Sequence, residues 1–295
     1  MTRSLTITPR GAFSLRESAE FGFGQRDAQR FDGVMRLAFV LDDLRTPVGV
    51  AVRQSGDSVT VDYDGTGDSD AVRRQVSRVL SLDHDARGFE AVGQRDPVVA
   101  RLQAVAPGLR PPLFHSPYEA AVWAVLSARR PARQMAPVRQ RLSEAHGTVF
   151  AVAGQELASL PTPQALVDVG SFPEIPDEKM ARIRGVAEAA LAGQLDVDRL
   201  VSLGPEAATA DLQSIKGIGP FYASLVVIRA TGLTDVLPVD EPMLRGLVTT
   251  LYRLDSPCTP ERLAEIAEPW RPFRTWASVL IRVAGSRLPQ PATTG

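Results

Sequence analysis

The run Gly217-Ile218-Gly219-Pro220 interrupts a stretch that otherwise has helical periodicity, "LQSIKGIGPFYASLVVIRA" at residues 212–230. Glycine tolerates the positive φ angle that ends a helix, and proline suits the first turn of the next one. The run therefore predicts a tight helix–hairpin–helix. The backbone amides of Gly217, Ile218 and Gly219 would then lie at the positive end of a helix dipole, where a phosphate can bind. The alternative is an ordinary helix–turn–helix packing element.

Asp240 is an acidic residue 21 positions after Gly219 (240 − 219), at the end of the apolar connection "LPV". It is a candidate for chemistry near the hairpin. It also directly precedes "EPMLRGLV", so it could instead be the N-cap of a helix that starts near Pro242. The residues alone leave both roles open.

Five arginines and no acidic residue occur in "ARRPARQMAPVRQR", residues 128–141. The whole chain has a net charge of −1 and a pI of about 6.3, without the global basic signature of many nucleic-acid-binding proteins. Contacts with phosphates must therefore be local. A charge run is often just a solvated face, but Arg129, Arg130 and Arg133 are candidates for phosphate contacts.

The elements that would carry these residues divide into two kinds. Alternating apolar residues between turn signals predict four strands, and Val72, Val76 and Val79 recur at helical spacing after them. From residue 96 onwards the segments are helical. We therefore expect an α+β fold with a small β-rich domain at residues 1–90, an all-helical domain at 91–288 and a disordered tail at 289–295.

The composition limits other function classes. The chain has 295 residues, of which 44% are hydrophobic, and no apolar run long enough to span a bilayer, so no membrane partner is expected. A single cysteine, Cys258, excludes an internal disulfide and any multi-cysteine metal site. His84, His115 and His146 are too scattered for a metal cluster, and we expect them at the surface or at helix caps. The N-terminus lacks an apolar signal core, which favours a cytoplasmic protein.

The segment "LQSIKGIGPFYASLVVIRATGLTDVLPVDEPML" resembles the signature of the helix–hairpin–helix (HhH-GPD) DNA glycosylase superfamily. The similarity is strongest to the bacterial 3-methyladenine DNA glycosylase II type. Similar stretches are "RLQAVAPGLRPP", "GVAEAALAG" and "AEPWRPFRTWASVLI", and the resemblance covers most of the chain, more weakly at the N-terminal end. It implies a TBP-like half, an antiparallel sheet with a helix, followed by an all-α glycosylase domain.

The resemblance also implies an activity. Such enzymes act in base excision repair, where they flip a damaged nucleotide out of double-stranded DNA and hydrolyse its N-glycosidic bond. Asp240 matches the catalytic aspartate, which stabilises the cationic sugar and helps to orient or deprotonate water. Phe221 matches a pocket aromatic that would bind a positively charged alkylated purine. Phe21 is a second wall of the base pocket by the same resemblance. Tyr222 and Trp276 are further candidates, for which core packing is the alternative.

Phe221 also bears on the type of reaction. Related glycosylases that cut the DNA strand carry a lysine at this position, which forms a Schiff base with the sugar. Phenylalanine cannot, and Lys216 lies on the other side of the hairpin turn. The resemblance thus implies a monofunctional enzyme that leaves an abasic site, acts as a monomer on nucleoid DNA and needs no cofactor. It leaves room for a monovalent cation at the hairpin carbonyls.

The sequence departs from this family at two places. Residues 127–131 are "SARRP" instead of the usual amide-containing stretch that fills the gap left by the flipped nucleotide. Either Arg129 fills that gap or another loop supplies the wedge. Arg282 stands where a second pocket tryptophan is expected, and a cation there would repel a cationic base. Its side chain therefore points elsewhere, or the substrate preference differs. Two rivals follow: a glycosylase for oxidised or bulky lesions, and a non-catalytic DNA-binding protein, although Asp240 argues against the latter.

Overall fold

The computed structural model describes residues 2–21 and 31–288. They form two compact units, each assembled from three separate stretches of chain. The first unit contains residues 2–8, 31–83 and 112–232, and the second contains residues 9–21, 84–111 and 233–288. The predicted division at residue 90 does not coincide with these units, because the chain leaves the first unit twice and returns to it.

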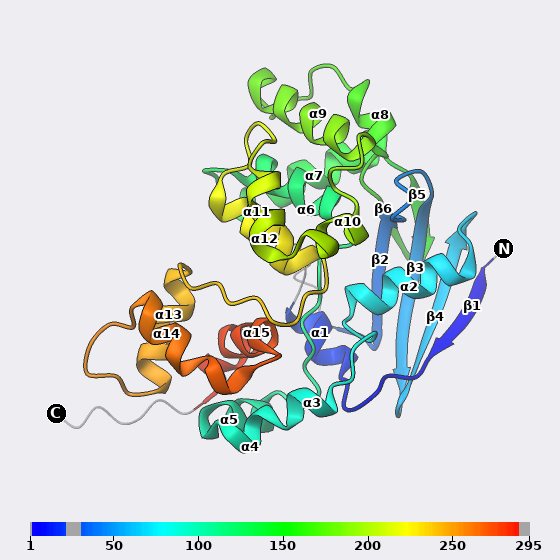
Figure 1. The fold of residues 1–295 in the computed structure, drawn as a ribbon. Coiled ribbons are helices and arrows are strands. Elements are labelled where there is room, and N and C mark those ends of the chain that lie inside the picture. The colour runs from blue at the N-terminus through cyan, green and yellow to red at the C-terminus, as the bar shows by residue number, and fades with distance from the viewer. Residues whose placement is uncertain (1, 22–30, 289–295) are drawn as a thin grey trace. The chain divides into compact units, whose positions relative to one another are not determined.

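The first unit contains the antiparallel sheet that the alternating pattern predicted (Figure 1). Its four strands, in the order β1-β4-β3-β2, are β1 (Arg3–Ile7), β2 (Val34–Val40), β3 (Pro47–Ser55) and β4 (Ser58–Gly65). Helix α2 (Ser69–Val79) packs on one face of the sheet and is capped by Asp68. Its three valines at helical spacing are fully buried, as are the alternate valines of β3. Both periodicities therefore produced the predicted buried faces.

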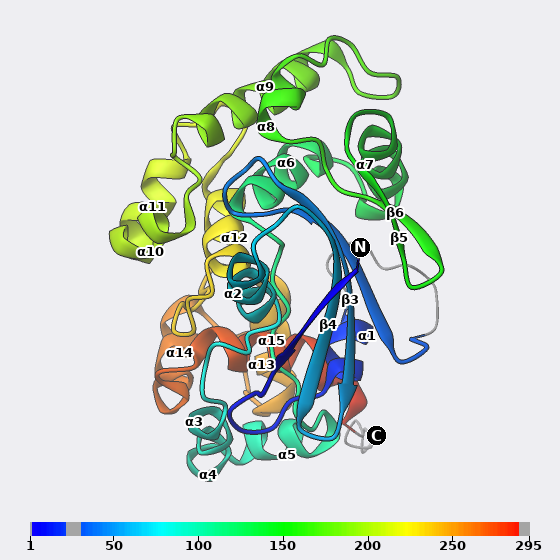
Figure 2. The same ribbon diagram turned by 90° about the vertical axis from the view of Figure 1, so that its right-hand side faces the viewer.

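A second small sheet lies in the segment that was expected to be all-helical. It is the hairpin of β5 (Val149–Val152) and β6 (Gln155–Ala158), on the sheet face opposite α2 (Figure 2). Any side chain at Gly49 of β3 would come within 2.6 Å of Phe150, so glycine permits this close approach. The Nε of Arg36 donates to the carbonyl of Ala153 at 3.2 Å. The all-helical expectation was wrong here because the outer sheet face is covered by a strand pair.

The helices of the first unit surround α6, of whose 11 residues all but the last are buried. Ser116 and Pro117 start this helix as the sequence predicted. Helix α6 packs against both α9 and α12. The helices are α6 (Pro117–Ser127), α7 (Ala132–His146), α8 (Pro163–Val167), α9 (Asp177–Leu191), α10 (Val197–Leu203), α11 (Pro205–Leu212) and α12 (Pro220–Ala230).

A buried ionic cluster ties α6 to α7. Glu119 is 1% exposed, and one of its carboxylate oxygens lies 2.7 Å from Arg139 Nη2 and 2.9 Å from His115 Nδ1. Burial by itself would raise the pKa of Glu119, but His115 and Arg139 bring the pKa below its ordinary value. The expectation that His115 is a surface or capping residue was wrong, because it packs inside this cluster. His84 is half-buried and His146 is exposed.

Arg78 joins the sheet region to the helices within the first unit. Its Nη1 donates to the carbonyl of Ala230 at the end of α12, at 2.7 Å, and its Nη2 donates to Asp42 and to the carbonyl of His115. A cation at a helix C-terminus is favoured by the unpaired carbonyls there. These contacts explain why the sheet and helices that were predicted as separate domains form one compact unit.

The second unit is helical around an aromatic core that includes Trp270, Phe273 and Trp276. Its helices are α1 (Leu15–Phe21), α3 (Arg87–Glu90), α4 (Val92–Arg95), α5 (Pro97–Val105), α13 (Pro242–Leu251), α14 (Pro260–Ile266) and α15 (Arg274–Ala284), with 3₁₀ turns η1 (Glu268–Trp270) and η2 (Gly285–Arg287). Asp96 caps α5, and its other oxygen accepts from Tyr252 Oη at 2.5 Å and Trp270 Nε1 at 2.8 Å. One buried carboxylate therefore fixes α5, α13 and η1 together.

Across the described part of the chain, no helix is both long enough and apolar enough to cross a membrane. The tail that was predicted to be disordered, residues 289–295, lies outside the described residues.

Candidate nucleic-acid interface

The predicted hairpin joins α11 to α12. Gly217 has a φ of +100°, the left-handed region that favours glycine, as the sequence predicted. Gly219 is the N-cap of α12, with Pro220 in the first turn, and no side chain of the described residues caps this helix. At Gly219 an added Cβ would meet no described heavy atom within 4 Å. The amides at the start of α12 therefore open to an external acceptor, which is the arrangement that binds phosphate.

Helices α9 and α6 pack against this turn. A Cβ at Gly217 would lie 3.1 Å from Arg182 Cδ of α9 and 3.6 Å from Val125 Cγ2 of α6. Ile218 is 3% exposed and donates its amide to the carbonyl of Ile215. Because the Ile218 amide is used inside the turn, the phosphate-binding role expected of it must fall on the other amides. The hairpin is thus held by apolar packing on one side and opens on the other.

The arginine run divides into two sets in the structure. Arg139 is buried beside Glu119, and Arg141 lies 2.6 Å from Glu174. Arg129, Arg130 and Arg133 are exposed. Arg129 has a φ of +60°, which is uncommon for a residue other than glycine. The three arginines that were predicted to contact phosphates are therefore exposed, whereas Arg141, also exposed, is paired with Glu174.

Two aromatic residues occupy the first turn of α12. The side chain of Phe221 is 61% exposed, although it is large and apolar. Tyr222 is half-buried, and the two ring centroids are 5.3 Å apart with an interplanar angle of 73°. An exposed phenyl ring beside an open helix start can pack on a nucleobase.

Asp240 lies in the second unit, in the turn before α13, and is exposed. The cap of α13 is its neighbour Glu241, whose carboxylate accepts the amides of Met243 at 3.3 Å and Leu244 at 2.7 Å. The alternative in which Asp240 caps this helix is therefore wrong. The carboxylate of Asp240 is therefore exposed and caps no helix among the described residues.

Comparisons with known proteins place this arrangement in a known fold. No protein-family model matches the chain. The chain is 24% identical to the DNA-3-methyladenine glycosylase of Bacillus subtilis over 213 residues, which are 70% of this chain and 69% of that protein. The 3-methyladenine DNA glycosylase from Archaeoglobus fulgidus superposes with a TM-score of 0.77 and 23% identity, over 96% of this chain and 98% of that one.

In sequence and in fold, the chain is similar to DNA glycosylases of the helix–hairpin–helix superfamily. The fold is shared across different specificities within the superfamily. The 8-oxoguanine glycosylase/lyase of Clostridium acetobutylicum, in complex with double-stranded DNA containing cytosine opposite 8-oxoguanine, superposes with a TM-score of 0.65 and 16% identity, over 98% of this chain and 99% of that one. The fold therefore does not determine which lesion is excised, so the side chains of the site must determine it.

Arg282, the departure from the superfamily pattern, is held by two neighbours in the second unit. Its Nη1 lies 3.4 Å from a carboxylate oxygen of Glu241, and its Nη2 lies 3.4 Å from Met243 Sδ. The negative charge of Glu241, the cap of α13, therefore lies beside the positive charge of Arg282. Of the two outcomes expected for Arg282, the first is favoured, because the side chain points to Glu241.

Trp276 is not a pocket residue. It is 2% exposed and packs within the second unit against Phe89 and Phe273, at centroid distances of 5.4 and 5.2 Å. Its assignment to the base pocket is corrected, and core packing, the alternative, describes it. Phe21 is the last residue of α1 and is half-buried. The residues that follow it, 22–30, lie outside the described residues, so its role as a pocket wall stays a prediction.

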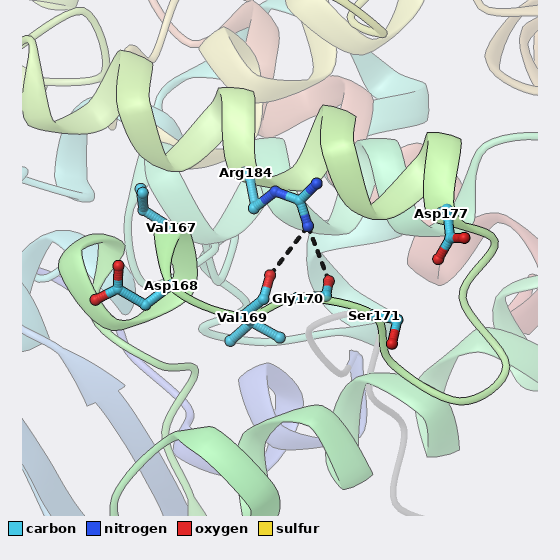
Figure 3. A pocket seen from close by; sticks show the side chains of 7 residues that line it. All are labelled: Val167, Asp168, Val169, Gly170, Ser171, Asp177 and Arg184. Atoms are coloured by element: carbon cyan, nitrogen blue, oxygen red, sulfur yellow. Dashed lines mark hydrogen bonds between the residues drawn. The ribbon is translucent and has the colours of Figure 1, made fainter.

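A pocket of about 360 Å³ opens elsewhere in the first unit, at the loop between α8 and α9 (Figure 3). Arg184 spans it and donates to the carbonyls of Val169 at 3.0 Å and Gly170 at 2.8 Å. None of the predicted site residues lines it. Within the described ranges, no three His, Cys, Asp or Glu side chains are grouped so that they could hold a metal ion.

The predicted residues are shared between the two units. The hairpin, the accessible arginines, Phe221 and Tyr222 belong to the first, and Asp240, Phe21 and Arg282 belong to the second. The sequence analysis missed Lys179 and Arg182 at the start of α9. The helix that carries them was predicted, but helical periodicity does not show which residues of other elements Lys179 and Arg182 contact.

Proposed function

We propose that this protein is a monofunctional DNA glycosylase of base excision repair that excises alkylated purines of the 3-methyladenine and 7-methylguanine type. The observation that carries the proposal is Asp240, an exposed carboxylate released from helix capping by Glu241. The name of the Bacillus subtilis relative and the superfamily fold support it. A protein that only binds DNA gains nothing from a free carboxylate near phosphates.

The chemistry follows from the charge on the substrate. Alkylation at N3 or N7 makes the purine cationic, so its bond to C1′ of the sugar breaks with the electron pair leaving on the base, which departs neutral. The positive charge then develops on the sugar, where the anionic form of Asp240 stabilises it. Water adds its oxygen to C1′, and its proton passes to Asp240 or to solvent. The products are a free base and an abasic site.

The first unit would bind the DNA backbone and the displaced base. The backbone amides of Gly217 and Gly219 would donate to a phosphate, and Arg130 and Arg133 would contact others. Arg129 would enter the gap left by the flipped nucleotide, where its planar guanidinium can stack on neighbouring bases. The exposed ring of Phe221 would attract a cationic base by about 0.5–2 kcal/mol. The active species is a monomer on double-stranded DNA.

Strand cleavage by a lyase step is not part of this proposal. Covalent capture of the sugar needs an amine, and Phe221 supplies none where the strand-cutting relatives have lysine. We expect borohydride to trap no covalent complex between the protein and an abasic or damaged duplex. A trapped complex that disappears in Lys216→Met would assign the missing amine to Lys216 and make the enzyme bifunctional.

Excision of an oxidised purine is the second candidate function. Arg282 favours it, because a guanidinium can donate hydrogen bonds to the carbonyl oxygens of such a base, whereas it repels a cationic one. The pairing of Arg282 with Glu241 weighs against this candidate, since the carboxylate offsets part of that repulsion.

One experiment separates these functions. The protein is incubated with randomly methylated DNA and, separately, with oxidised DNA, and the released bases are identified by chromatography. We expect methylated purines from the first substrate and little release from the second. Release of oxidised bases alone would replace the proposed specificity, and a gel shift without any release would establish a non-catalytic DNA-binding protein.

A further inference from the structure

Lys179, in the first turn of α9, closes the end of α6. Of the 33 lysine and arginine residues in the chain, only Lys179 and Lys216 are lysines. Lys179 Nζ donates to the carbonyl oxygens of Leu126 at 2.9 Å and Ala128 at 3.1 Å. The last carbonyls of a helix have no amide partner within that helix. Lys179 supplies the missing donors and adds a positive charge at the negative end of the dipole.

The second of these carbonyls belongs to the peptide group that leads into Arg129. Arg129 then takes a left-handed φ of +60°, and Arg130 donates its amide back to Ser127 at 3.0 Å. A side chain other than glycine occupies this region only when its surroundings hold it there. The bond from Lys179 to Ala128 is such a constraint, because it fixes the plane of the peptide before Arg129.

The same turn of α9 also reaches the hairpin. Arg182 is three residues after Lys179, and its Cδ lies 3.1 Å from the place where a Cβ on Gly217 would be. Burial lowers the pKa of Lys179, and the nearby charges of Arg130 and Arg182 lower it further. These cations are therefore close enough to interact. Two loops that are distant in the sequence, the arginine turn and the hairpin, are thus joined through one turn of α9.

We propose that Lys179 is a positioning residue for base flipping. By holding the Ala128 carbonyl it sets the conformation from which the Arg129 side chain enters the gap left by the displaced nucleotide. This inference rests on the proposed function, and in particular on the role of Arg129. Lys179 acts through Arg129 and does not itself touch the flipped base.

A double-mutant cycle tests this role. The variants are Lys179→Met, Arg129→Ala and the pair together, with Lys216→Met as the matched loss of the other lysine. The first readout is single-turnover base release from methylated DNA that is saturated with protein. The second is the fluorescence of 2-aminopurine placed beside the lesion, which rises when neighbouring bases unstack. Thermal unfolding of each variant shows whether it remains folded.

We expect Lys179→Met to slow base release about ten- to a hundredfold and to reduce the fluorescence change, with little change in KM. The double variant should be no slower than Arg129→Ala alone, because both changes remove the same function. Lys216→Met should combine with Arg129→Ala by simple multiplication. Lys179→Arg should recover part of the rate, because it restores the charge and a donor.

Two results would overturn the inference: base release by Lys179→Met at the parental rate, or losses that multiply in the Lys179 and Arg129 double variant. If Lys179→Met does not fold, Lys179→Gln keeps one donor for the same cycle and must show the same dependence on Arg129. Base release by the parental protein tests the proposed function separately. If the parental protein and the Lys179 variant release bases equally well, only the proposed role of Lys179 is contradicted, and the proposed function stands.

Discussion

Helices α12 and α13 both begin with proline, but their starts are built for opposite partners. Gly219 precedes Pro220, and α12 has no side-chain cap among the described residues. Glu241 precedes Pro242, and its carboxylate takes up two amides of α13. The first start is open to an anion from outside. The second is already neutralised by the chain itself.

This difference shows how one residue decides what a helix start can bind. Where it is glycine, the amides remain for a phosphate. Where it is glutamate, the amides are used, and the preceding residue, Asp240, does not cap the helix. The open start then suits the negative DNA backbone, and the free carboxylate suits a sugar that becomes positive during the reaction.

The largest expected effect comes from removing the support beneath the open start. Glu119→Ala leaves Arg139 buried without its counterion, which should lower the free energy of unfolding of the first unit by about 3–5 kcal/mol. Chemical denaturation followed by hydrogen exchange, peptide by peptide, measures it. A loss of stability confined to the second unit, or no loss of stability, would show that the Glu119 cluster does not stabilise α6.

The same carboxyl gives this support a pH dependence. The pKa of Glu119 in the folded protein is below its ordinary value of 4.5, because His115 and Arg139 outweigh the effect of burial. Its charged form therefore stabilises the fold fully above about pH 4.5, and this stability is lost as the pH falls through the lowered pKa. In Glu119→Gln the acid-dependent part of the unfolding curve should be smaller. An unchanged curve would contradict this account.

A smaller effect is expected when the open start is closed deliberately. Gly219→Asp gives α12 the kind of cap that Glu241 gives α13, so one phosphate contact should be lost. The Kd for duplex DNA should rise about ten- to a hundredfold, the cost of one hydrogen bond to a charged group. Gly219→Asn is the uncharged control and should weaken binding less. Unchanged affinity in both variants would show that α12 does not bind a phosphate.

The smallest effect belongs to the closed start. Glu241→Ala removes a helix cap, which should cost about 1 kcal/mol in the free energy of unfolding of the second unit. Base release should persist at a reduced rate, because Asp240 is unchanged but Arg282 loses its counterion. Denaturation and a base-release assay on the same preparation measure both. Complete loss of base release without loss of stability would contradict the assignment of the chemistry to Asp240.

Much of this arrangement could be predicted from local signals. Glycine and proline fixed the hairpin turn, because few other residues accept a φ of +100° or a helix start without an amide. Alternation and helical spacing located the strands of the first sheet and the helix after them. These features depend on neighbours within a few residues, which the sequence displays directly.

What could not be predicted depends on contacts that are distant in the sequence. Trp276 could be pocket or core until Phe89, far away in the chain, was seen to cover it. His115 gave no sign of its burial beside Arg139, and the β5–β6 hairpin had strands of only four residues each. The division into domains failed for the same reason, since Arg78 bonds Ala230 across the predicted boundary.

The most direct test is to compare base release by the parental protein and by Asp240→Asn on methylated DNA, at protein concentrations where both bind the duplex equally. We predict that Asp240→Asn retains binding and releases methylated purines at least 10²–10³-fold more slowly, about the loss expected when one charge-stabilising group is removed. Release by Asp240→Asn at the parental rate would contradict the central claim that this carboxylate stabilises the cationic sugar as the base departs.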